Sequence, residues 1–521
     1  MNRPKLRLGT RRSTLAWAQS LWVAERLHAL DRTVEFELVP IETRGDRIQD
    51  APLSQVEGKD FFTAELDRAL LDGQVDINVH SLKDLSLERP EGIALAAIPP
   101  RENPRDVILF AGDIVERLEN SMPVRIGTSA PRRLQNIPPF LADALPNGGN
   151  ADLQWLEIRG NVDTRLGRLH ATDERKLDGV VLAMAGLIRL WRDRRPDGGR
   201  ERLERLLQGV RWMVLPIAEC PAAPGQGALA VECREDDTAT LTLLRRLNDE
   251  ETGRQVDEER AVLARHGGGC HQRFGATCIT HPACGNVLYV RGAAQDGTAL
   301  DELTWLSLPD AAAGEIRAWD GMRIREAALR DHTAESEMDA ALFMSDAPVF
   351  IAHSRALPEG SEDRMRNRRV WVSGVQSWRR LARRGVWVEG CADGLGFDWI
   401  KPTLDEEVLA LPAQDDWQIL THAAAIETWQ RGQVIGTYAL PQAEAHVIKD
   451  AASVTHAFWA TGSQFRELHA QLPASVEHAC GPGKTADLIR ASGVKKLTVF
   501  PSVDEWRRWL KIDDTASRFD D

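Results

Sequence analysis

One stretch near residue 80 ends in side chains that can do acid–base chemistry. Residues 76–84 read Asp-Ile-Asn-Val-His-Ser-Leu-Lys-Asp, and Ile77 and Val79 alternate with polar positions at the period of a β-strand. Ligands of α/β folds gather at the carboxyl ends of strands. We therefore predict that Asp84 is a carboxylate delivered to a cleft, with Lys83 as its charged neighbour. A solvated turn with a structural charge pair explains the same residues equally well.

Arginine recurs where predicted strands run into helices. Guanidinium groups match carboxylates and phosphates with two parallel hydrogen bonds, and helix N-termini add backbone donors. Taken singly, each arginine is more simply explained by a surface ion pair. Together, at equivalent points of the fold, they predict a cleft for a ligand with several anionic groups. The residues are Arg11, Arg44, Arg132, Arg133, Arg159, Arg165 and Arg189.

Phosphate is the first anion to consider for this cleft. Residues 481–485 read Gly-Pro-Gly-Lys-Thr, but His478 stands where the first glycine of a P-loop belongs. No Gly-x-Gly-x-x-Gly follows a predicted strand either, so the dinucleotide-binding motif is absent from the sequence. Carboxylates are therefore the expected anions.

A glycine-rich loop presents a thiol at Cys270. Three glycines, 267–269, precede it, so the backbone is unhindered and can lie close to a ligand. The thiol can act as a nucleophile or as a covalent anchor, or it can be a small buried cysteine. Neighbouring residues do not have the Cys-x(2–4)-Cys spacing of structural zinc, and we predict no metal. They are His266, His271, Cys278, His281 and Cys284.

The order of the elements around these residues predicts an α/β fold. Strands alternate with helices, which is typical of a parallel sheet. The first strands are expected at 6–10, 36–40 and 77–80, and the first helices at 14–29 and 61–71. Proline and arginine crowd into 99–104, where we expect a hinge or crossover before a second α/β unit. Near Ala347 the pattern restarts in a separate α/β module.

Composition excludes several classes of protein. The chain has 521 residues, a net charge of −13 and 43% hydrophobic residues, which is ordinary for a globular protein and gives no support for nucleic-acid or membrane partners. The longest apolar run, 179–188, is shorter than the ~20 residues that span a bilayer. Seven scattered cysteines and no signal-like N-terminus lead us to expect a reduced, cytoplasmic protein.

The motifs together resemble the hydroxymethylbilane synthase family, also called porphobilinogen deaminase, over roughly residues 5–300. They occur in a dense and ordered series. In chain order they are Thr10-Arg11-Arg12-Ser13, Thr43-Arg44-Gly45-Asp46, Val79-His80-Ser81-Leu82-Lys83-Asp84, Pro104-Arg105-Asp106, Gly127-Thr128-Ser129, Arg132-Arg133, Arg159-Gly160-Asn161-Val162, Thr164-Arg165, Gly225-Gln226-Gly227-Ala228 and Gly268-Gly269-Cys270.

The resemblance implies a specific chemistry. The family carries a dipyrromethane cofactor in thioether linkage to a cysteine, here Cys270, and adds four porphobilinogen units to it with loss of ammonia. Its catalytic carboxylate falls on Asp84, beside Lys83. Cofactor contacts fall on Ser13, Lys83, Thr128, Ser129, Arg132 and Arg133. Substrate carboxylate contacts fall on Arg11, Arg159, Arg165 and Arg189. We expect a monomer.

Residues 346–521 resemble uroporphyrinogen-III synthase, chiefly through 460–463, 479–488 and 501–502. The resemblance implies an enzyme that closes the linear tetrapyrrole with inversion of one ring, with Tyr438 and Ser463 lining its cleft. The usual opening strand and helix are not found in the first lobe. A non-catalytic docking lobe is the alternative for this module, and a periplasmic-type anion-binding module is the alternative for the front half.

The predicted fold class is α/β, with two periplasmic-binding-protein-like lobes, a small α+β third domain and a C-terminal α/β module like uroporphyrinogen-III synthase. Lobe 1 is expected at 1–100 and 205–225, and lobe 2 at 101–204. The cofactor-anchoring third domain is expected at 226–345, and the C-terminal module at 346–521.

Overall fold

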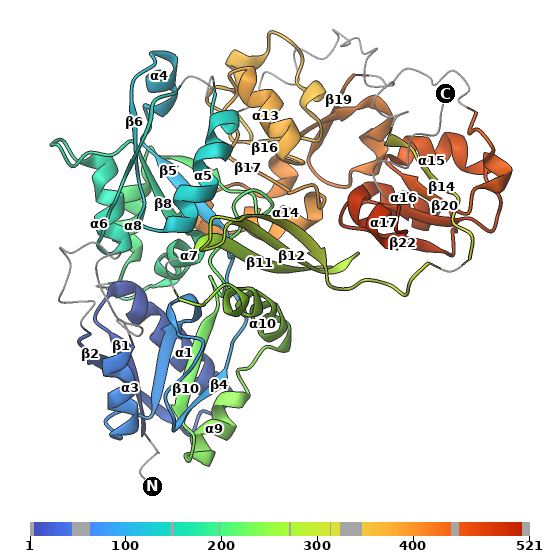
Figure 1. Cartoon of the computed structure of the whole chain (residues 1–521). Helices are drawn as coiled ribbons and strands as arrows, with labels where there is room; N and C mark the ends of the chain where they lie inside the picture. The colour runs from blue at the N-terminus through green and yellow to red at the C-terminus, as the bar shows by residue number, and fades with distance from the viewer. Residues whose placement is uncertain are drawn as a thin grey trace. The chain divides into compact units, whose positions relative to one another are not determined.

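A computed structural model describes most of the chain, which divides into two compact units (Figure 1). The first unit is Met1–Cys278, Leu288–Glu302 and Glu406–Ala410, and the second is Ile279–Val287, Leu303–Asp405 and Leu411–Asp521. No helix in the described part of the chain is long and apolar enough to cross a membrane. The described residues are 5–43, 63–146, 151–196, 198–269, 272–312, 314–322, 346–438 and 447–512.

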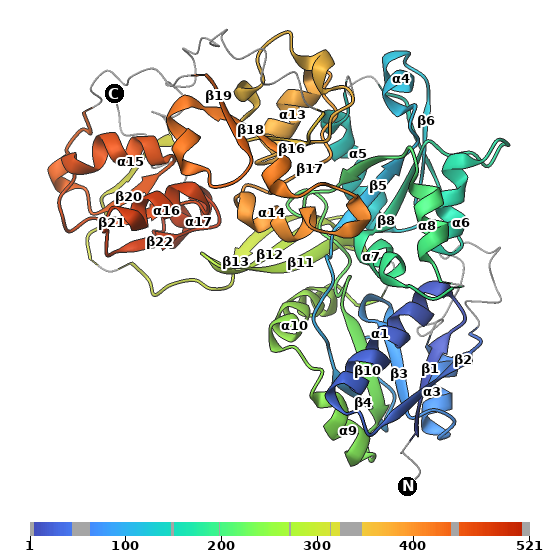
Figure 2. The same ribbon diagram turned by 180° about the vertical axis from the view of Figure 1, so that it is seen from behind.

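The first unit begins with a five-stranded sheet of order β2-β1-β3-β10-β4. The strands are β1 (Lys5–Arg11), β2 (Glu35–Ile41), β3 (Ile77–Ser81), β4 (Ile93–Ala97) and β10 (Leu229–Arg234). Strand β1 pairs in parallel with β2 and β3, as predicted, whereas β10 runs antiparallel to both β3 and β4. Figure 2 shows these strands side by side, in blue and green.

Helices cover both faces of this sheet. On one face, α1 (Thr14–Leu30) and α9 (Thr238–Arg245) share a core with the strands. On the other face, α3 (Ala64–Leu71) packs against the strands through Ala69 and Leu70. Helix α1 starts where it does because the Ser13 hydroxyl accepts a hydrogen bond from the Ala16 amide.

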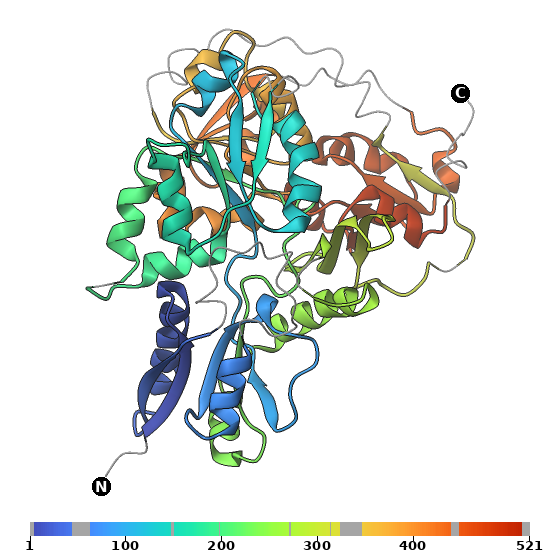
Figure 3. The same cartoon turned by 60° about the vertical axis from the view of Figure 1, so that its left-hand side comes forward.

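A second five-stranded sheet, of order β7-β6-β8-β5-β9, forms the other lobe of this unit. Its strands are β5 (Asp106–Phe110), β6 (Val124–Gly127), β7 (Leu153–Leu156), β8 (Gly179–Ala183) and β9 (Arg211–Val214). All five residues of β5 are buried. Figure 3 shows the cyan and green helices of this lobe on both sides of its strands. The helices are α4 (Ile114–Glu119), α5 (Pro131–Ala144), α6 (Val162–Gly167), α7 (Met184–Arg192) and α8 (Arg200–Leu207).

Two strands lie in the opposite lobe from the one predicted. Strand β9 pairs with β5 in the second sheet, so assigning 205–225 to the first lobe is wrong for this strand. Strand β10 completes the first sheet, so assigning it to a third domain at 226–345 is also wrong. The chain returns to the first lobe later than expected, between β9 and β10. Short apolar strands carry the same pattern in either sheet, and only pairing decides which sheet they join.

The chain after α9 is helical and then strand-rich. Helix α10 (Glu250–Arg265) starts at Asp249, whose carboxylate accepts a hydrogen bond from the Thr252 amide. A three-stranded sheet of order β11-β12-β13 follows. Its strands are β11 (Arg273–His281), β12 (Gly285–Ala293) and β13 (Ala299–Trp305).

The second unit holds two further sheets in which every described pairing is parallel. One has the order β17-β16-β15-β18-β19 and the other β14-β20-β21-β22. Their strands are β14 (Ala318–Asp320), β15 (Val349–Ile351), β16 (Val370–Val372), β17 (Gly390–Cys391), β18 (Gln418–His422), β19 (Gln433–Tyr438), β20 (His456–Trp459), β21 (Glu477–Cys480) and β22 (Leu497–Val499). Helices α13 (Val375–Arg383), α14 (Phe397–Leu404), α15 (Gly462–Leu468) and α16 (Lys484–Ala491) lie between strands along the chain, and α17 (Val503–Trp509) follows the last strand.

The C-terminal module begins earlier than predicted. Strand β14 pairs with β20 and extends that sheet, so the boundary at residue 346 is wrong and the module includes 318–320. Strand β14 joins the sheet of β20, β21 and β22 and not that of β15 and β16, so the missing opening strand and helix of the first lobe stay a prediction. Residues 323–345 lie outside the described part of the chain. A three-residue strand has too short a pattern to be found without its partner.

Candidate active site

Strand β3 delivers the predicted acid–base pair at its carboxyl end. The strand ends at Ser81 and continues as one helical turn, Leu82–Asp84. Leu82 is buried, and its amide donates a hydrogen bond to Ala228 O at 3.0 Å, which fixes the turn. Lys83 is half-buried and Asp84 is exposed, so a ligand can reach the carboxylate.

Lys83 faces residues of the second lobe. Its Nζ lies 3.3 Å from Gln226 Oε1. Burial lowers the pKa of Lys83 below its ordinary value; the Asp84 carboxylate opposes this shift, and Arg133 and Arg132 add to it. The first lobe's acid–base pair and the second lobe's arginines therefore share one electrostatic environment.

Arg132 and Arg133 converge on one buried acid, Asp106, at the start of β5. Arg132 Nη1 lies 2.6 Å from Asp106 Oδ2, and Arg133 Nη2 lies 2.8 Å from Oδ1. Burial alone would raise the pKa of Asp106, but the two guanidinium groups hold it far below the ordinary value. Two cations on one anion leave a net positive charge at the start of α5, which suits an anionic ligand.

Gln226 joins this cluster to the first lobe. It is fully buried, and its side-chain amide donates to Asp106 Oδ1 at 2.8 Å and to Pro104 O at 2.7 Å. Its Oε1 accepts from Arg132 at 3.2 Å and contacts Lys83. The sequence reasoning did not single out Gln226 or Asp106 as site residues. The signal for Gln226 was its position between two glycines in a segment joining two strands.

Arg165 belongs to the same electrostatic group. Burial, with repulsion from Arg133 and Arg159, lowers the pKa of Arg165 to about 10, and Asp84 acts in the opposite direction. Its Nε donates to Gly160 O at 2.8 Å, which keeps the side chain at the start of α6. Arg133, Arg159 and Asp84 therefore all act on Arg165, and the predicted polyanion cleft stays a prediction.

Arg189 occupies a different position. Its Nη2 donates to Gly227 O at 2.6 Å, on the chain that returns to the first lobe. Burial lowers the pKa of Arg189 to about 10, and the charged groups that act on it are Glu102 and Arg192. None of the described contacts brings it to Asp84.

Thr128 offers a polar atom that fits a bound group. Its Oγ1 is buried and has no hydrogen-bond partner among the described residues. It precedes α5, next to the arginine pair, and Ser129 beside it is half-buried. Ser13 in the first lobe is already used as the cap of α1. Arg11 is half-buried at the end of β1.

The predicted anchor Cys270 lies outside the described residues, as do His271 and the predicted anion ligand Arg44. The flanks of Cys270 are described. A Cβ on Gly268 would lie 3.4 Å from Leu87 Cδ1, three residues after Asp84. The Arg260 side chain of α10 also donates hydrogen bonds to Leu85 O and Ser86 O, in the loop that follows Asp84. The residues before Cys270 therefore lie beside the loop that follows Asp84.

The other cysteines near this loop are poor nucleophiles. Cys278 and Cys284 are buried, and burial raises the pKa of Cys278 to about 12 and that of Cys284 to about 11. His281 uses both ring nitrogens: Nε2 contacts Leu395 O at 3.0 Å, and Nδ1 accepts from the Ala283 amide.

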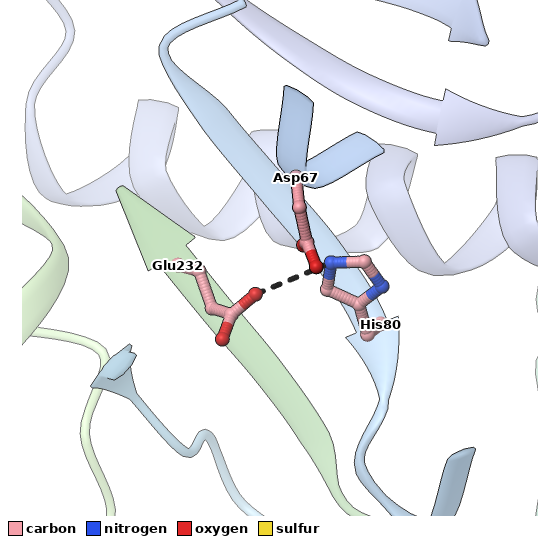
Figure 4. Close-up of side chains that lie close together, drawn as sticks. All are labelled: Asp67, His80 and Glu232. Atoms are coloured by element: carbon pink, nitrogen blue, oxygen red, sulfur yellow. Dashed lines mark ion pairs between the residues drawn. The ribbon is translucent and has the colours of Figure 1, made fainter. Parts of the chain in front are cut away.

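A buried cluster of Asp67, His80 and Glu232 has the composition of a metal site (Figure 4). One ligand atom of each lies within 4.8 Å of the others. However, Arg89 donates to Asp67 Oδ1 at 2.6 Å and to both oxygens of Glu232 at 2.7 and 2.9 Å. A guanidinium thus takes the place that a metal cation would occupy.

In the second unit, a lysine links the two parallel sheets. Lys484 Nζ donates to Thr428 O at 2.6 Å and lies 3.4 Å from the centre of the Trp429 ring. A Cβ on Gly396 would lie 3.2 Å from Gly483 Cα, so the backbones approach closely here. Burial lowers the pKa of Lys484 to about 8, although Asp398 and Asp487 oppose this shift.

The two residues predicted for the C-terminal cleft lie on different elements. Tyr438 is buried at the end of β19, with its ring 6.0 Å from that of His422. Ser463 is half-buried in the first turn of α15. None of the described contacts joins them.

Comparisons with known proteins match the first unit. The family model "Porphobilinogen deaminase, dipyromethane cofactor binding domain" matches residues 6–242. A porphobilinogen deaminase of Syntrophotalea carbinolica is 42% identical over 271 residues, 52% of this chain and 77% of the relative. The porphobilinogen deaminase of Bacillus subtilis is 40% identical over 266 residues, which cover 51% of this chain and 76% of the relative. The porphobilinogen deaminase of Geobacter metallireducens is 38% identical over 335 residues, which cover 64% of this chain and 93% of the relative.

Among solved structures, the BenM effector-binding domain with benzoate has a TM-score of 0.25 and 12% identity, covering 52% of this chain and 96% of that one. That score is too low to support an argument about fold.

Two α/β lobes that bring Lys83 near the paired Arg132 and Arg133 are typical of a protein that binds anionic groups. The chain belongs to the porphobilinogen deaminase family. The predicted family and the dipyrromethane cofactor are thereby confirmed for the front half. The individual roles of Asp84, Cys270 and the arginines stay predictions, as does the resemblance of the C-terminal module.

We expect Asp106→Asn to destabilise the first unit by about 3–5 kcal/mol, because Arg132 and Arg133 would lose the charge that compensates their burial. Urea unfolding at neutral pH measures this. Because the pKa of Asp106 is lowered on folding, its contribution is present above the ordinary aspartate pKa and is lost as pH falls below it.

Asp173→Asn is the matched control, because Asp173 pairs with Arg175 on an exposed surface. Its unfolding curve should superimpose on that of the unchanged protein. Equal stability of the Asp106 and Asp173 variants would contradict the central role of Asp106.

Proposed function

We propose that this chain is a hydroxymethylbilane synthase of tetrapyrrole (haem) biosynthesis that joins four porphobilinogen units, with loss of ammonia, on a dipyrromethane primer held by Cys270 in thioether linkage. Water then releases the linear product. One observation carries the proposal: Asp84 is exposed at the end of β3, within the field of Lys83 and Arg165. The family match supports it independently.

Asp84 is the catalytic group. Loss of ammonia from porphobilinogen leaves a cationic carbon on the substrate. A fixed carboxylate stabilises that charge and can also move the pyrrole N–H proton. Lys83, held against Gln226, would contact ligand carboxylates.

The second lobe holds the acidic side chains of the ligands. Arg132 and Arg133 are fixed by Asp106 before any ligand arrives, and their shared positive charge faces Lys83. Residues that would hold the dipyrromethane are Ser13, Lys83, Thr128, Ser129, Arg132 and Arg133. The unpartnered Thr128 Oγ1 is consistent with this assignment. Arg11, Arg159, Arg165 and Arg189 would bind substrate carboxylates. When bound, dipyrromethane supplies the pyrrole carbon at which the chain starts to grow.

For the second unit we propose a uroporphyrinogen-III synthase activity that closes the linear product with inversion of one ring. The specific observation in favour is the pair of parallel sheets joined through Lys484 and Gly483. Tyr438 and Ser463 would line the site. Fusion keeps both steps at high effective concentration.

Asp84→Asn should lower the rate of porphobilinogen consumption at least ~100-fold, because the substitution keeps the shape and removes the charge that stabilises the cation. A colorimetric assay of porphobilinogen loss measures it, and circular dichroism checks the fold. Near-normal turnover would refute the assignment.

Cys270→Ser should yield folded protein without dipyrromethane, because the hydroxyl cannot form the thioether. Intact-mass spectrometry of the purified protein measures this directly. A variant that still carries the cofactor mass would show that another residue is the anchor. Unsubstituted protein without a covalent dipyrrole would favour the anion-binding alternative.

The second activity is tested by supplying hydroxymethylbilane and identifying the ring isomer. We expect the type III isomer, and a shift towards type I in Tyr438→Phe. Conversion by the unsubstituted chain to the symmetric type I product alone would mean that the module is a docking lobe.

A further inference from the structure

One buried carboxylate, Glu232, contacts both ends of the segment that carries Asp84. The segment 81–88 is bracketed in sequence by His80 and Arg89. Arg89 Nε lies 2.7 Å from Glu232 Oε1, and Arg89 Nη2 lies 2.9 Å from Oε2. His80 Nε2 lies 3.3 Å from the same Oε2. Figure 4 shows the His80 ring beside Glu232 and Asp67.

The sheet places Glu232 where it can make both contacts. Strand β10 runs antiparallel to β3, with Glu232 opposite Asn78 and Ala230 opposite His80. His80 is therefore the diagonal neighbour of Glu232 on the same face of the sheet. Arg89 reaches the same carboxylate after the chain has made its excursion through Asp84.

Asp67 of α3 holds Arg89 from the other side. Its Oδ1 accepts from Arg89 Nη2 at 2.6 Å. Glu232 is fully buried, and Asp67 and His80 are buried as well. Burial alone would raise the pKa of Glu232, but His80 and Arg89 hold it below its ordinary value, so the carboxylate is charged. Contacts of this kind in a dry interior are costly to break.

The middle of the segment is held by other elements. Arg260 of α10 donates to Leu85 O at 3.3 Å and to Ser86 O at 2.9 Å. Leu87 lies against Gly268, two residues before the proposed anchor. Moving the ends of the segment would therefore shift Asp84 relative to the loop that carries the cofactor.

We propose that Glu232 is a positioning residue for the deaminase reaction. It closes the segment 81–88 into a loop by accepting hydrogen bonds from Arg89 while it contacts His80, and so fixes where Asp84 meets the substrate. Closing both ends removes conformational freedom that the exposed Asp84 would otherwise have. The inference rests on the proposed catalytic role of Asp84.

The test compares Glu232→Gln with a matched control, Asp76→Asn, in the full-length, cofactor-loaded protein. Asp76 precedes β3 at its opposite end and is also buried, pairing with Arg7 and Arg234. Glu232→Gln should lower kcat by about 10- to 100-fold with a much smaller change in KM, because misplacement of the acting group affects chemistry more than binding. Asp76→Asn should lower the unfolding midpoint without changing kcat.

Two further readouts separate positioning from general stability. Intact mass should show equal dipyrromethane loading in both variants. Amide hydrogen exchange should rise in the peptide covering 81–88 of Glu232→Gln and stay unchanged in β1. Arg89→Lys, which keeps the charge but loses the two-pronged contact, should retain part of the activity. If Glu232→Gln does not fold, Arg89→Lys and Asp67→Asn are assayed in its place, with the same measurements.

The proposal is overturned if Glu232→Gln, equally loaded, keeps kcat within about twofold of the unsubstituted enzyme. It is also overturned if exchange rises equally across the whole first sheet, since that is the signature of a purely structural role. Asp84→Asn is assayed alongside. If it is inactive while Glu232→Gln is normal, only the positioning role fails. If it is fully active, the proposed function itself fails.

Discussion

The basic site depends on the buried Asp106 carboxylate. Arg132 and Arg133 lie side by side at the start of α5, and without an anion between them their charges would repel in a poorly solvated place. Sharing one acid lets both guanidinium groups stay charged and fixed before a ligand binds. The cluster keeps a net positive charge, so it can stabilise carboxylates without first reorganising. Gln226 extends the same network to Lys83 and so connects the two lobes chemically.

Close backbone contact between the two lobe-crossing segments makes this connection possible. Gly227 has φ +88°, and a Cβ there would lie 2.3 Å from Glu102 O, which no side chain could tolerate. The Glu102 amide donates to Gly227 O at 3.0 Å, and Arg189 donates to the same oxygen. These bonds place Gln226 between the lobes. Arg189 therefore supports the crossing.

The second unit follows a different physical plan. Its largest fully buried side chains include Trp371, Trp378, Trp417, Trp459 and Trp506, and its sheets are short and parallel. It lacks, among its described residues, a cluster of arginines around a single buried acid like that of Asp106. Lys484 is one of the polar groups described at the junction of its two sheets.

Local features were predictable from sequence, whereas long-range pairings were not. The strand period around Ile77, the helix that begins at Thr14 and the turn bearing Lys83 and Asp84 are encoded within a few residues, and the structure contains them. Sheet membership of β9, β10 and β14 depends on pairing with strands about 100 or more residues away. The partners of Asp106 and Glu232 are likewise distant in the chain. A single buried acid has no recognisable local sequence pattern, because its role depends on the cations that folding brings next to it.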